Sequence, residues 1–175
     1  MRTLALPCIA ALTLLVSPLA AQETRTVIDD LGREVEVPID PQRIISGDDN
    51  TLGMPLADFG VDFIGAQARV ADDGSYFMRG LDVNYGISFE ASGIEPVSVW
   101  WEFDLEKVAL LDPDLIFLID WQQEQAELFE QIAPTFFVFE TPEPWAVQQA
   151  IARATGKEDV FEYRRGIYED RVATL

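Results

Sequence analysis

The residues of this sequence that could do chemistry are mostly carboxylates. Three acidic doublets stand out: Asp29-Asp30, Asp48-Asp49 and Asp72-Asp73. Paired carboxylates can bind Ca²⁺ or Mg²⁺, or divide the roles of general acid and general base. None of the three doublets has the D-x-D-x-D-G spacing of a calcium loop, and neighbouring side chains in a strand or loop point apart. We therefore predict that the doublets are mainly solvated surface or helix caps.

Other patterns that would indicate an enzyme or a metal site are missing from the sequence. It contains no histidine, and its single cysteine, Cys8, lies near the N-terminus. It has no G-x-S-x-G elbow, no phosphate-binding glycine loop and no metal-binding set of cysteines. We predict no catalytic residue, no metal site and no cofactor.

Aromatic and arginine side chains in polar segments favour a binding site instead. Trp100-Trp101 precede a predicted helix, and Trp121 follows the apolar run 115–119. Tryptophan is large, rigid and able to stack on a bulky ligand. The alternative for each tryptophan is packing in the core. For the adjacent pair we expect one side chain to pack and the other to face outward.

A second group of candidates lies in residues 67–92, which show no periodicity and are predicted to form a long loop. Loops of this length in a compact domain are usually functional or mobile. Arg69, Tyr76 and Arg79 lie in this segment. Arginine offers planar donors to carboxylate or hydroxamate oxygens. The alternative for the arginines is a surface counter-charge.

Composition limits the possible partners. The chain has 175 residues, with 12 basic and 31 acidic side chains and a formal net charge of -19. Its length fits one domain with a sizeable core. A nucleic-acid backbone must be met by clustered Lys and Arg, so the charge argues against such a partner.

The N-terminus has the features of a secretory signal peptide. Arg2 gives a positive start, an apolar run follows from Leu4 to Leu19, and Ala20-Ala21 precede a polar segment. A membrane anchor is the alternative, but Pro7 and Pro18 interrupt the run, and a spanning helix needs about 20 apolar residues. We predict that residues 1–21 are removed. The mature protein would carry a charge of -20, from 11 basic and 31 acidic groups, and would be a periplasmic or extracellular protein without stable membrane insertion.

The rest of the chain alternates short apolar runs with helical patterns, which predicts an α/β fold with a parallel sheet. Residues 27–37 are predicted to form a hairpin around the turn Asp30-Leu31-Gly32. Further strands are predicted near 43–45, 63–66, 97–99, 115–119 and 135–139, and helices near 51–59, 104–111, 123–132 and 145–155. The run 115–119 is typical of a strand buried on both faces.

A last helix is predicted from Glu158. Its apolar residues fall near one face, and the pattern continues to the last residue without a capping signal. This favours missing sequence, although a solitary terminal helix is the alternative. The apolar stripe consists of Phe161, Ile167, Tyr168, Val172 and Leu175.

Two segments of the sequence resemble the iron-siderophore periplasmic binding proteins of ABC transporters. One is Thr26-Val-Ile-Asp-Asp-Leu-Gly-Arg-Glu-Val-Glu-Val-Pro38 followed by Pro41-Gln-Arg-Ile-Ile45. The other is Phe103-Asp-Leu-Glu-Lys-Val-Ala-Leu-Leu-Asp-Pro-Asp-Leu-Ile-Phe117. Ile132-Ala-Pro-Thr135 and the helix after Lys157 are further points of similarity.

The resemblance implies a Rossmann-like lobe of a two-lobed fold. Residues 22–156 would be the N-terminal ligand-binding lobe, and 157–175 the start of the helix that joins it to a second lobe, which is absent. The implied function is capture of a ferric siderophore in the periplasm and its delivery to an inner-membrane ABC permease, without catalysis. Glu106 would dock on a permease arginine; its alternative is a solvated residue in the first turn of a helix. The candidate ligand-binding residues are Asp48, Asn50, Arg69, Tyr76, Arg79, Trp100, Trp101 and Trp121.

Two other functions stay open. The ligand could be haem or cobalamin, since related binders share the fold; the lack of histidine argues against haem ligation, although tyrosine can ligate haem iron. From a different class, the chain could be an exported acidic metal-dependent hydrolase.

Overall fold

The computed structural model describes residues 22–143 and 145–175. The predicted signal peptide, residues 1–21, lies outside the described residues. Over the described ranges, no helix combines the length and the apolar composition that crossing a membrane requires.

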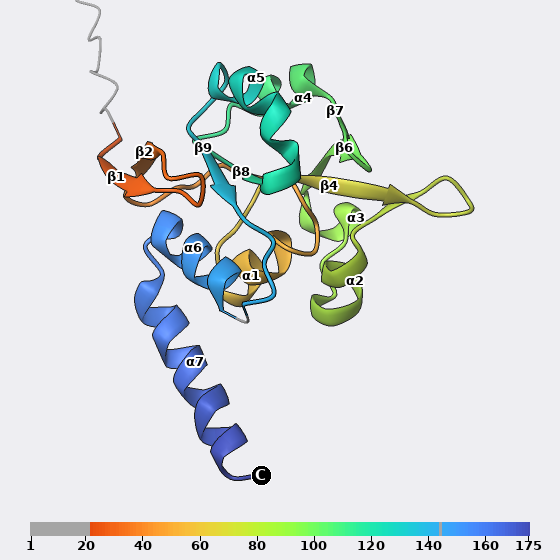
Figure 1. Ribbon diagram of the computed structural model, residues 1–175. Helices are drawn as coiled ribbons and strands as arrows, with labels where there is room; N and C mark the ends of the chain where they lie inside the picture. The colour runs from red at the N-terminus through yellow and green to blue at the C-terminus, as the bar shows by residue number, and fades with distance from the viewer. Residues whose placement is uncertain (1–21, 144) are drawn as a thin grey trace, which may run out of the picture.

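The centre of the fold is a mostly parallel sheet with the strand order β7-β6-β4-β3-β8-β9, and β5 pairs with the outer end of β4 (Figure 1). Strands β6, β4, β3, β8 and β9 run parallel, whereas β7 and β5 are antiparallel to their neighbours. The predicted parallel α/β fold is thus confirmed. The strands are β3 (Ile44–Ser46), β4 (Gly65–Val70), β5 (Tyr76–Phe77), β6 (Glu95–Val99), β7 (Glu102–Phe103), β8 (Leu115–Ile119) and β9 (Thr135–Val138).

Helices cover both faces of this sheet. Figure 1 shows α4 and α5 on one side, and α1 and α6 on the other. The helices are α1 (Gly53–Asp58), α2 (Arg79–Tyr85), α3 (Phe89–Ser92), α4 (Leu105–Leu110), α5 (Ala126–Glu130), α6 (Ala146–Thr155) and α7 (Glu158–Ala173), with a 3-10 helix, η1 (Asp120–Gln125), before α5.

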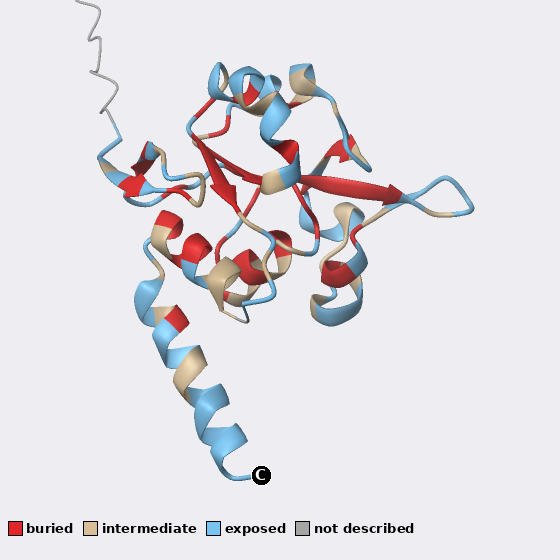
Figure 2. Cartoon of the chain, viewed as in Figure 1, coloured by how far each residue is buried: buried red, intermediate tan, exposed pale blue. Residues whose placement is uncertain are grey.

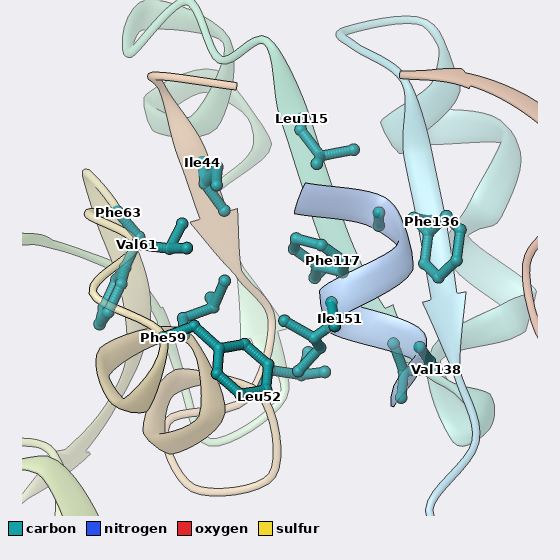
Figure 3. Close-up of a cluster of buried hydrophobic side chains, with 14 of the residues drawn as sticks. Ile44, Leu52, Phe59, Val61, Phe63, Leu115, Phe117, Phe136, Val138 and Ile151 are labelled. Atoms are coloured by element: carbon teal, nitrogen blue, oxygen red, sulfur yellow. The ribbon is translucent and has the colours of Figure 1, made fainter. Parts of the chain in front are cut away.

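Two hydrophobic clusters follow from the alternation of side chains along the strands. On the face of α1 and α6, Leu115, Phe117 and Ile119 of β8 pack against Leu52 and Ile151 (Figure 3). The intervening Ile116 and Leu118 face the other way, toward α4 and α5. All five residues of β8 are buried, which confirms the prediction of a strand covered on both faces.

A separate two-stranded hairpin, β1 (Thr24–Ile28) and β2 (Glu34–Pro38), lies beside the sheet as predicted. Its turn is closed by Asp29, whose carboxylate accepts hydrogen bonds from the backbone N–H groups of Leu31 and Arg33 at 3.0 and 2.9 Å. Gly32 adopts a φ of +78°, a conformation that glycine reaches without steric cost.

The prediction of a long loop over residues 67–92 was wrong. Strand β4 continues to Val70, and β5, α2 and α3 follow within the same segment. The cause is the polar character of Gln67 and Arg69, which are buried in β4 and break the apolar pattern of a strand. Helices α2 and α3 are too short to show a clear helical period.

The helix predicted over 123–132 also differs, because the chain first forms η1 and then the five-residue helix α5. In contrast, α4 matches its prediction. Asp104 caps it by accepting a hydrogen bond from the N–H of Lys107 at 2.9 Å, and Val108 is fully buried.

Helix α7 extends away from the sheet after a break at Gly156, and its last turns are largely exposed (Figures 1 and 2). Of the residues in the predicted apolar stripe, Phe161 is buried in the core. Tyr168 packs edge-on against Trp145 with ring centroids 5.1 Å apart, although it stays half exposed. Ile167, Val172 and Leu175 are exposed.

A polar network joins α7 to α1 and α2. The guanidinium of Arg164 lies 3.0 Å from the Asp58 carboxylate. Burial, together with a hydrogen bond to Asp58, raises the pKa of Tyr85 to about 12. The folded state therefore favours the neutral phenol, so the contribution of Tyr85 to stability is present below about pH 10 and is lost as pH rises from about 10 to 12.

We expect a phenolate absorbance titration to show a late step near pH 12 from one of the four tyrosines. Tyr85→Phe should abolish the late step, while Tyr163→Phe, at an exposed position on α7, should leave it. A late step that persists in Tyr85→Phe would contradict this assignment.

Candidate functional site

The carboxyl ends of the parallel strands meet at one edge of the sheet, where ligands bind in open α/β folds. Five strands, β3, β4, β6, β8 and β9, are each followed there by polar or aromatic residues. These segments surround a cavity of about 220 Å³, which we call the cleft. Its lining residues are Asp48, Asn50, Thr51, Arg69, Arg79, Trp101, Ile119, Trp121 and Glu140.

Most of the ligand-binding candidates predicted from the sequence come together in the cleft. Those that line it are Asp48, Asn50, Arg69, Arg79, Trp101 and Trp121. Trp100 lies beside it, because the Arg69 guanidinium stacks over its ring. Tyr76 is the one candidate that the structure places elsewhere.

Tyr76 lines a separate cavity of about 190 Å³ with Ser98, Glu102, Asp104 and Lys107. The reason is topological. Because the segment after β4 turns back as β5, Tyr76 pairs with Val70 at the outer end of β4. The predicted loop would have let Tyr76 fold over the cleft, and the observed strand does not.

The floor of the cleft is a buried ion-pair network. Asp49 is fully buried, and its carboxylate lies 2.9 Å from the Arg79 guanidinium and 3.9 Å from that of Arg69. Asp48 lies 3.5 Å from Arg79 on the other side. The hydrogen bond from Arg79 to Asp49 raises the pKa of the guanidinium. Arg79 is therefore charged at any pH at which the protein is folded.

The two aspartates have different structural tasks. Asp48 accepts hydrogen bonds from the backbone N–H groups of Asn50 and Thr51 in the loop before α1, whereas α1 itself has no side-chain cap, so the prediction of a helix cap was wrong for this doublet. Asp49 instead accepts a hydrogen bond from the backbone N–H of Arg79 at 2.6 Å and ties α2 to the loop after β3. The expectation that this doublet is solvated was wrong for both residues, because both are buried.

The residues of the other two acidic doublets also differ in burial and in hydrogen-bond partners. Asp29 is buried in the β1–β2 turn, and Asp30 pairs with Arg153 at 3.0 Å. Asp73 is exposed and accepts hydrogen bonds from Ser75, which lower its pKa. In residues 22–143 and 145–175, no group of three or more His, Cys, Asp or Glu side chains is placed to hold a metal ion.

The aromatic wall of the cleft is built on a two-residue turn. Val99 of β6 pairs with Glu102 of β7, so Trp100 and Trp101 form the hairpin tip. Trp100 has a φ of +57°, which is costly for a bulky residue. The buried side chain of Gln67 donates a hydrogen bond to the Trp100 carbonyl and helps to hold this conformation.

The turn explains why the prediction for this pair was wrong. We expected one tryptophan to pack and the other to face outward, as on a strand, but both are half exposed. The Trp101 ring meets the edge of Trp121 with centroids 5.0 Å apart, and the rings of Trp100 and Trp101 lie 5.9 Å apart. Three indoles from two segments therefore form one continuous aromatic surface.

Arg69 connects this surface to the buried network. Its guanidinium carbon lies 4.3 Å from the centre of the Trp100 ring, and its Nη2 donates to Gln67 at 3.3 Å. Its Nε is buried and has no hydrogen-bond partner among the described residues. Arg69 thus stacks on the aromatic wall rather than presenting a free positive charge to solvent.

Sequence reasoning missed Gly47 and Gln122, which hold the base of the cleft. A Cβ on Gly47 would lie 2.6 Å from the carbonyl oxygen of Phe117, so the two loops can approach only because this residue is glycine. Gln122 is buried and donates to the Gly47 carbonyl at 3.0 Å while accepting from the N–H of Ile119. A glycine directly after a buried strand was the available signal for the first residue; no sequence signal marked the second.

A larger cavity of about 630 Å³ lies at the opposite edge of the sheet, between β2 and the start of β9. Arg33, which lines it, is already bound by Asp29, by Glu130 and by the carbonyl of Thr135. This cavity contains none of the ligand-binding candidates. The residues that line the two cavities therefore favour the smaller one, the cleft, as the ligand-binding site.

Comparison with known proteins rests on structure alone. No protein-family model matches the sequence, and no curated protein matches it. The petrobactin-binding protein YclQ from Bacillus subtilis is 24% identical, with a TM-score of 0.68 over 87% of this chain and 52% of that protein. SirA from Staphylococcus aureus, solved with staphyloferrin B, is 21% identical, with a TM-score of 0.68 over 86% of this chain and 48% of SirA. FhuD2 from the same organism is 22% identical, with a TM-score of 0.66 over 87% of this chain and 50% of FhuD2.

The chain spans about half the length of these solved proteins. The similarity extends over 86–87% of this chain. The chain therefore has the fold of siderophore-binding periplasmic proteins, over about half of their length.

Proposed function

We propose that the protein is the solute-binding component of a ferric-siderophore ABC importer, that it works in the periplasm and that it is not an enzyme. The observation that carries this proposal is the cleft itself. An aromatic wall and two arginines converge at the carboxyl ends of the strands, in a fold whose solved examples include siderophore-binding proteins.

The side chains of the cleft favour binding of a bulky chelate with flat faces over catalysis of a reaction. The exposed indole faces offer stacking area with little loss of side-chain entropy. Asp48 and Asp49, the carboxylates that a hydrolase would use, are occupied by Arg79 and by backbone N–H groups. Glu140 is the one carboxylate of the cleft lining outside this network, and in residues 22–143 and 145–175 no group of three or more His, Cys, Asp or Glu side chains is placed to hold a metal ion.

In this proposal, residues 22–156 supply one wall of the binding site, residues 157–175 begin the helix that joins the two lobes, and a second lobe supplies the other wall. The exposed end of α7 and the half-length match to the solved proteins support it. One wall that retains half of the binding free energy of a nanomolar site would bind with a Kd of roughly 10–100 µM.

The test is quenching of tryptophan fluorescence by a ferric chelate. We expect saturable quenching without turnover, and a loss of affinity of about tenfold when Trp101 or Trp121 is replaced by alanine, because each removes one stacking face (about 1.4 kcal/mol). Trp145→Phe is the matched control, since Trp145 contacts Phe161 and Tyr168 of α7 instead of lining the cleft. Unchanged affinity in both cleft variants would contradict the proposed site.

We also propose that Glu106 docks on a basic residue of the permease. Its side chain is exposed in the first turn of α4. Glu106→Lys should impair uptake in cells that carry the complete importer, without changing chelate affinity, whereas Glu127→Lys, on α5, should not impair uptake. An equal loss of chelate binding in Glu106→Lys would assign this residue to the ligand site instead.

A further inference from the structure

The charge balance of the cleft carries an inference about the class of ligand, which rests on the proposed function. Two guanidinium groups, those of Arg69 and Arg79, line the cleft, and an isolated arginine pair would favour an anionic chelate. Here both belong to the buried network, in which Asp49 lies within 4 Å of each guanidinium group. Their charge is therefore largely neutralised before any ligand arrives.

The remaining lining residues make the site negative. Asp48 and Glu140 line the cleft, and Asp49 lies beneath it, so three carboxylates stand against two guanidinium groups, a net charge of -1. Among the described residues, no lysine lines the cleft. The uncompensated carboxylate is Glu140, which follows β9 and is exposed at the rim.

An adjoining cavity of about 340 Å³ extends the same potential. It shares Asn50, Thr51 and Glu140 with the cleft and adds two carboxylates, that of Glu143 and that of Asp58, which is paired with Arg164. Its described lining residues include no Lys or Arg. A ligand that extends from the aromatic wall into this second cavity therefore leaves an uncharged surface and approaches negatively charged side chains.

From this arrangement we infer that the cleft selects ferric chelates of zero or positive charge, such as trihydroxamates, and disfavours trianionic tris-catecholates. Three hydroxamates neutralise Fe³⁺, whereas three doubly deprotonated catecholates leave three negative charges. The aromatic wall binds a neutral chelate by stacking, and Glu140 attracts an ammonium group carried by such a chelate. A trianion instead meets a site of net charge -1 on a protein of strongly negative charge.

The experiment compares three gallium or iron chelates by fluorescence quenching at 0.1 M and 1 M salt. These are a neutral trihydroxamate, a trihydroxamate with one ammonium group, and a trianionic tris-catecholate. We expect the tris-catecholate to bind at least tenfold more weakly than either trihydroxamate at 0.1 M salt. The difference should narrow at 1 M, where the Debye length falls to about 3 Å.

Glu140→Gln should reduce the preference for the ammonium-bearing chelate over the neutral one by about threefold to tenfold. Glu162→Gln, the same charge change on α7, should leave that preference unchanged. Equal or tighter binding of the tris-catecholate would overturn the inference while leaving the proposed function intact. Failure of all three chelates to quench at millimolar concentration would overturn both.

Discussion

Replacing Asp49 with asparagine is expected to lower the free energy of unfolding by about 3 kcal/mol, because it leaves two guanidinium groups without their buried counter-charge. Asp49 is fully buried, and its carboxylate contacts the side chain and the backbone N–H of Arg79 and lies near Arg69. The substituted amide could still accept one hydrogen bond but would carry no charge. The value is at the low end for a broken buried pair, since Arg79 is half exposed and can be hydrated.

Thermal unfolding is the measurement, and a loss of about 6–12 °C in Tm is the expected result for a domain of this size. Asp73→Asn is the matched control. Asp73 lies at the exposed tip of the loop between β4 and β5, where its carboxylate accepts hydrogen bonds from Ser75, so the Tm of the Asp73→Asn variant should change by no more than about 2 °C. Equal Tm values for the two variants would show that the Asp49 network contributes nothing to stability.

Phe117→Ala is expected to destabilise the protein by about 3–5 kcal/mol, the usual cost of deleting a fully buried phenylalanine and leaving a cavity. Phe117 is fully buried at the centre of β8, in the core beneath α1 and α6, and its ring meets that of Phe136 with centroids 5.7 Å apart. Its backbone carbonyl also accepts the N–H of Gly47 at 2.8 Å. Relaxation of β8 into the cavity would therefore displace the loop at the base of the cleft.

Chemical denaturation can measure this effect, with Tyr163→Ala as the control because that aromatic ring is 71% exposed on α7. The control should change the free energy of unfolding by less than about 0.5 kcal/mol. If Phe117→Ala cost no more than the control, the assignment of β8 as the centre of the core would be wrong.

Elements with a strong local signal were predictable from the sequence. The run 115–119 was long enough and apolar enough to indicate a strand buried on both faces, and it is β8. Asp104 before an apolar helical face indicated α4, and the capping hydrogen bond is present. A glycine turn between alternating runs indicated the β1–β2 hairpin. In each case, local propensity and tertiary packing favour the same structure.

Prediction failed where long-range contacts decide the structure. Strand β4 carries the buried polar residues Gln67 and Arg69, which are acceptable there because Trp100, Asp49 and the Gln67 amide itself provide partners. Those partners come from segments that the sequence alone does not bring together. The same holds for Tyr76, whose position depends on the pairing of β5 with β4.

The sequence allowed most of the residues that lie together in the cleft to be named in advance, but it did not allow the charge balance of the cleft to be predicted. Trp101, Trp121 and Arg79, three of the candidates chosen from the sequence, line the same cleft in the structure. The neutralisation of Arg69 and Arg79 depends on the burial of Asp49, and the sequence favoured an exposed doublet at that position. The inferred class of ligand therefore needed the structure.

The central claim is that the cleft binds a metal chelate, and the indole N–H signals of the four tryptophans test it most directly. A gallium trihydroxamate, a diamagnetic substitute for the ferric chelate, should be titrated into ¹⁵N-labelled protein. We predict saturable shifts of the Trp100, Trp101 and Trp121 signals with a single Kd, and no shift of the Trp145 signal, because Trp145 packs against α7. Unchanged signals from the three cleft tryptophans at millimolar chelate, or an equal shift of Trp145, would contradict the claim.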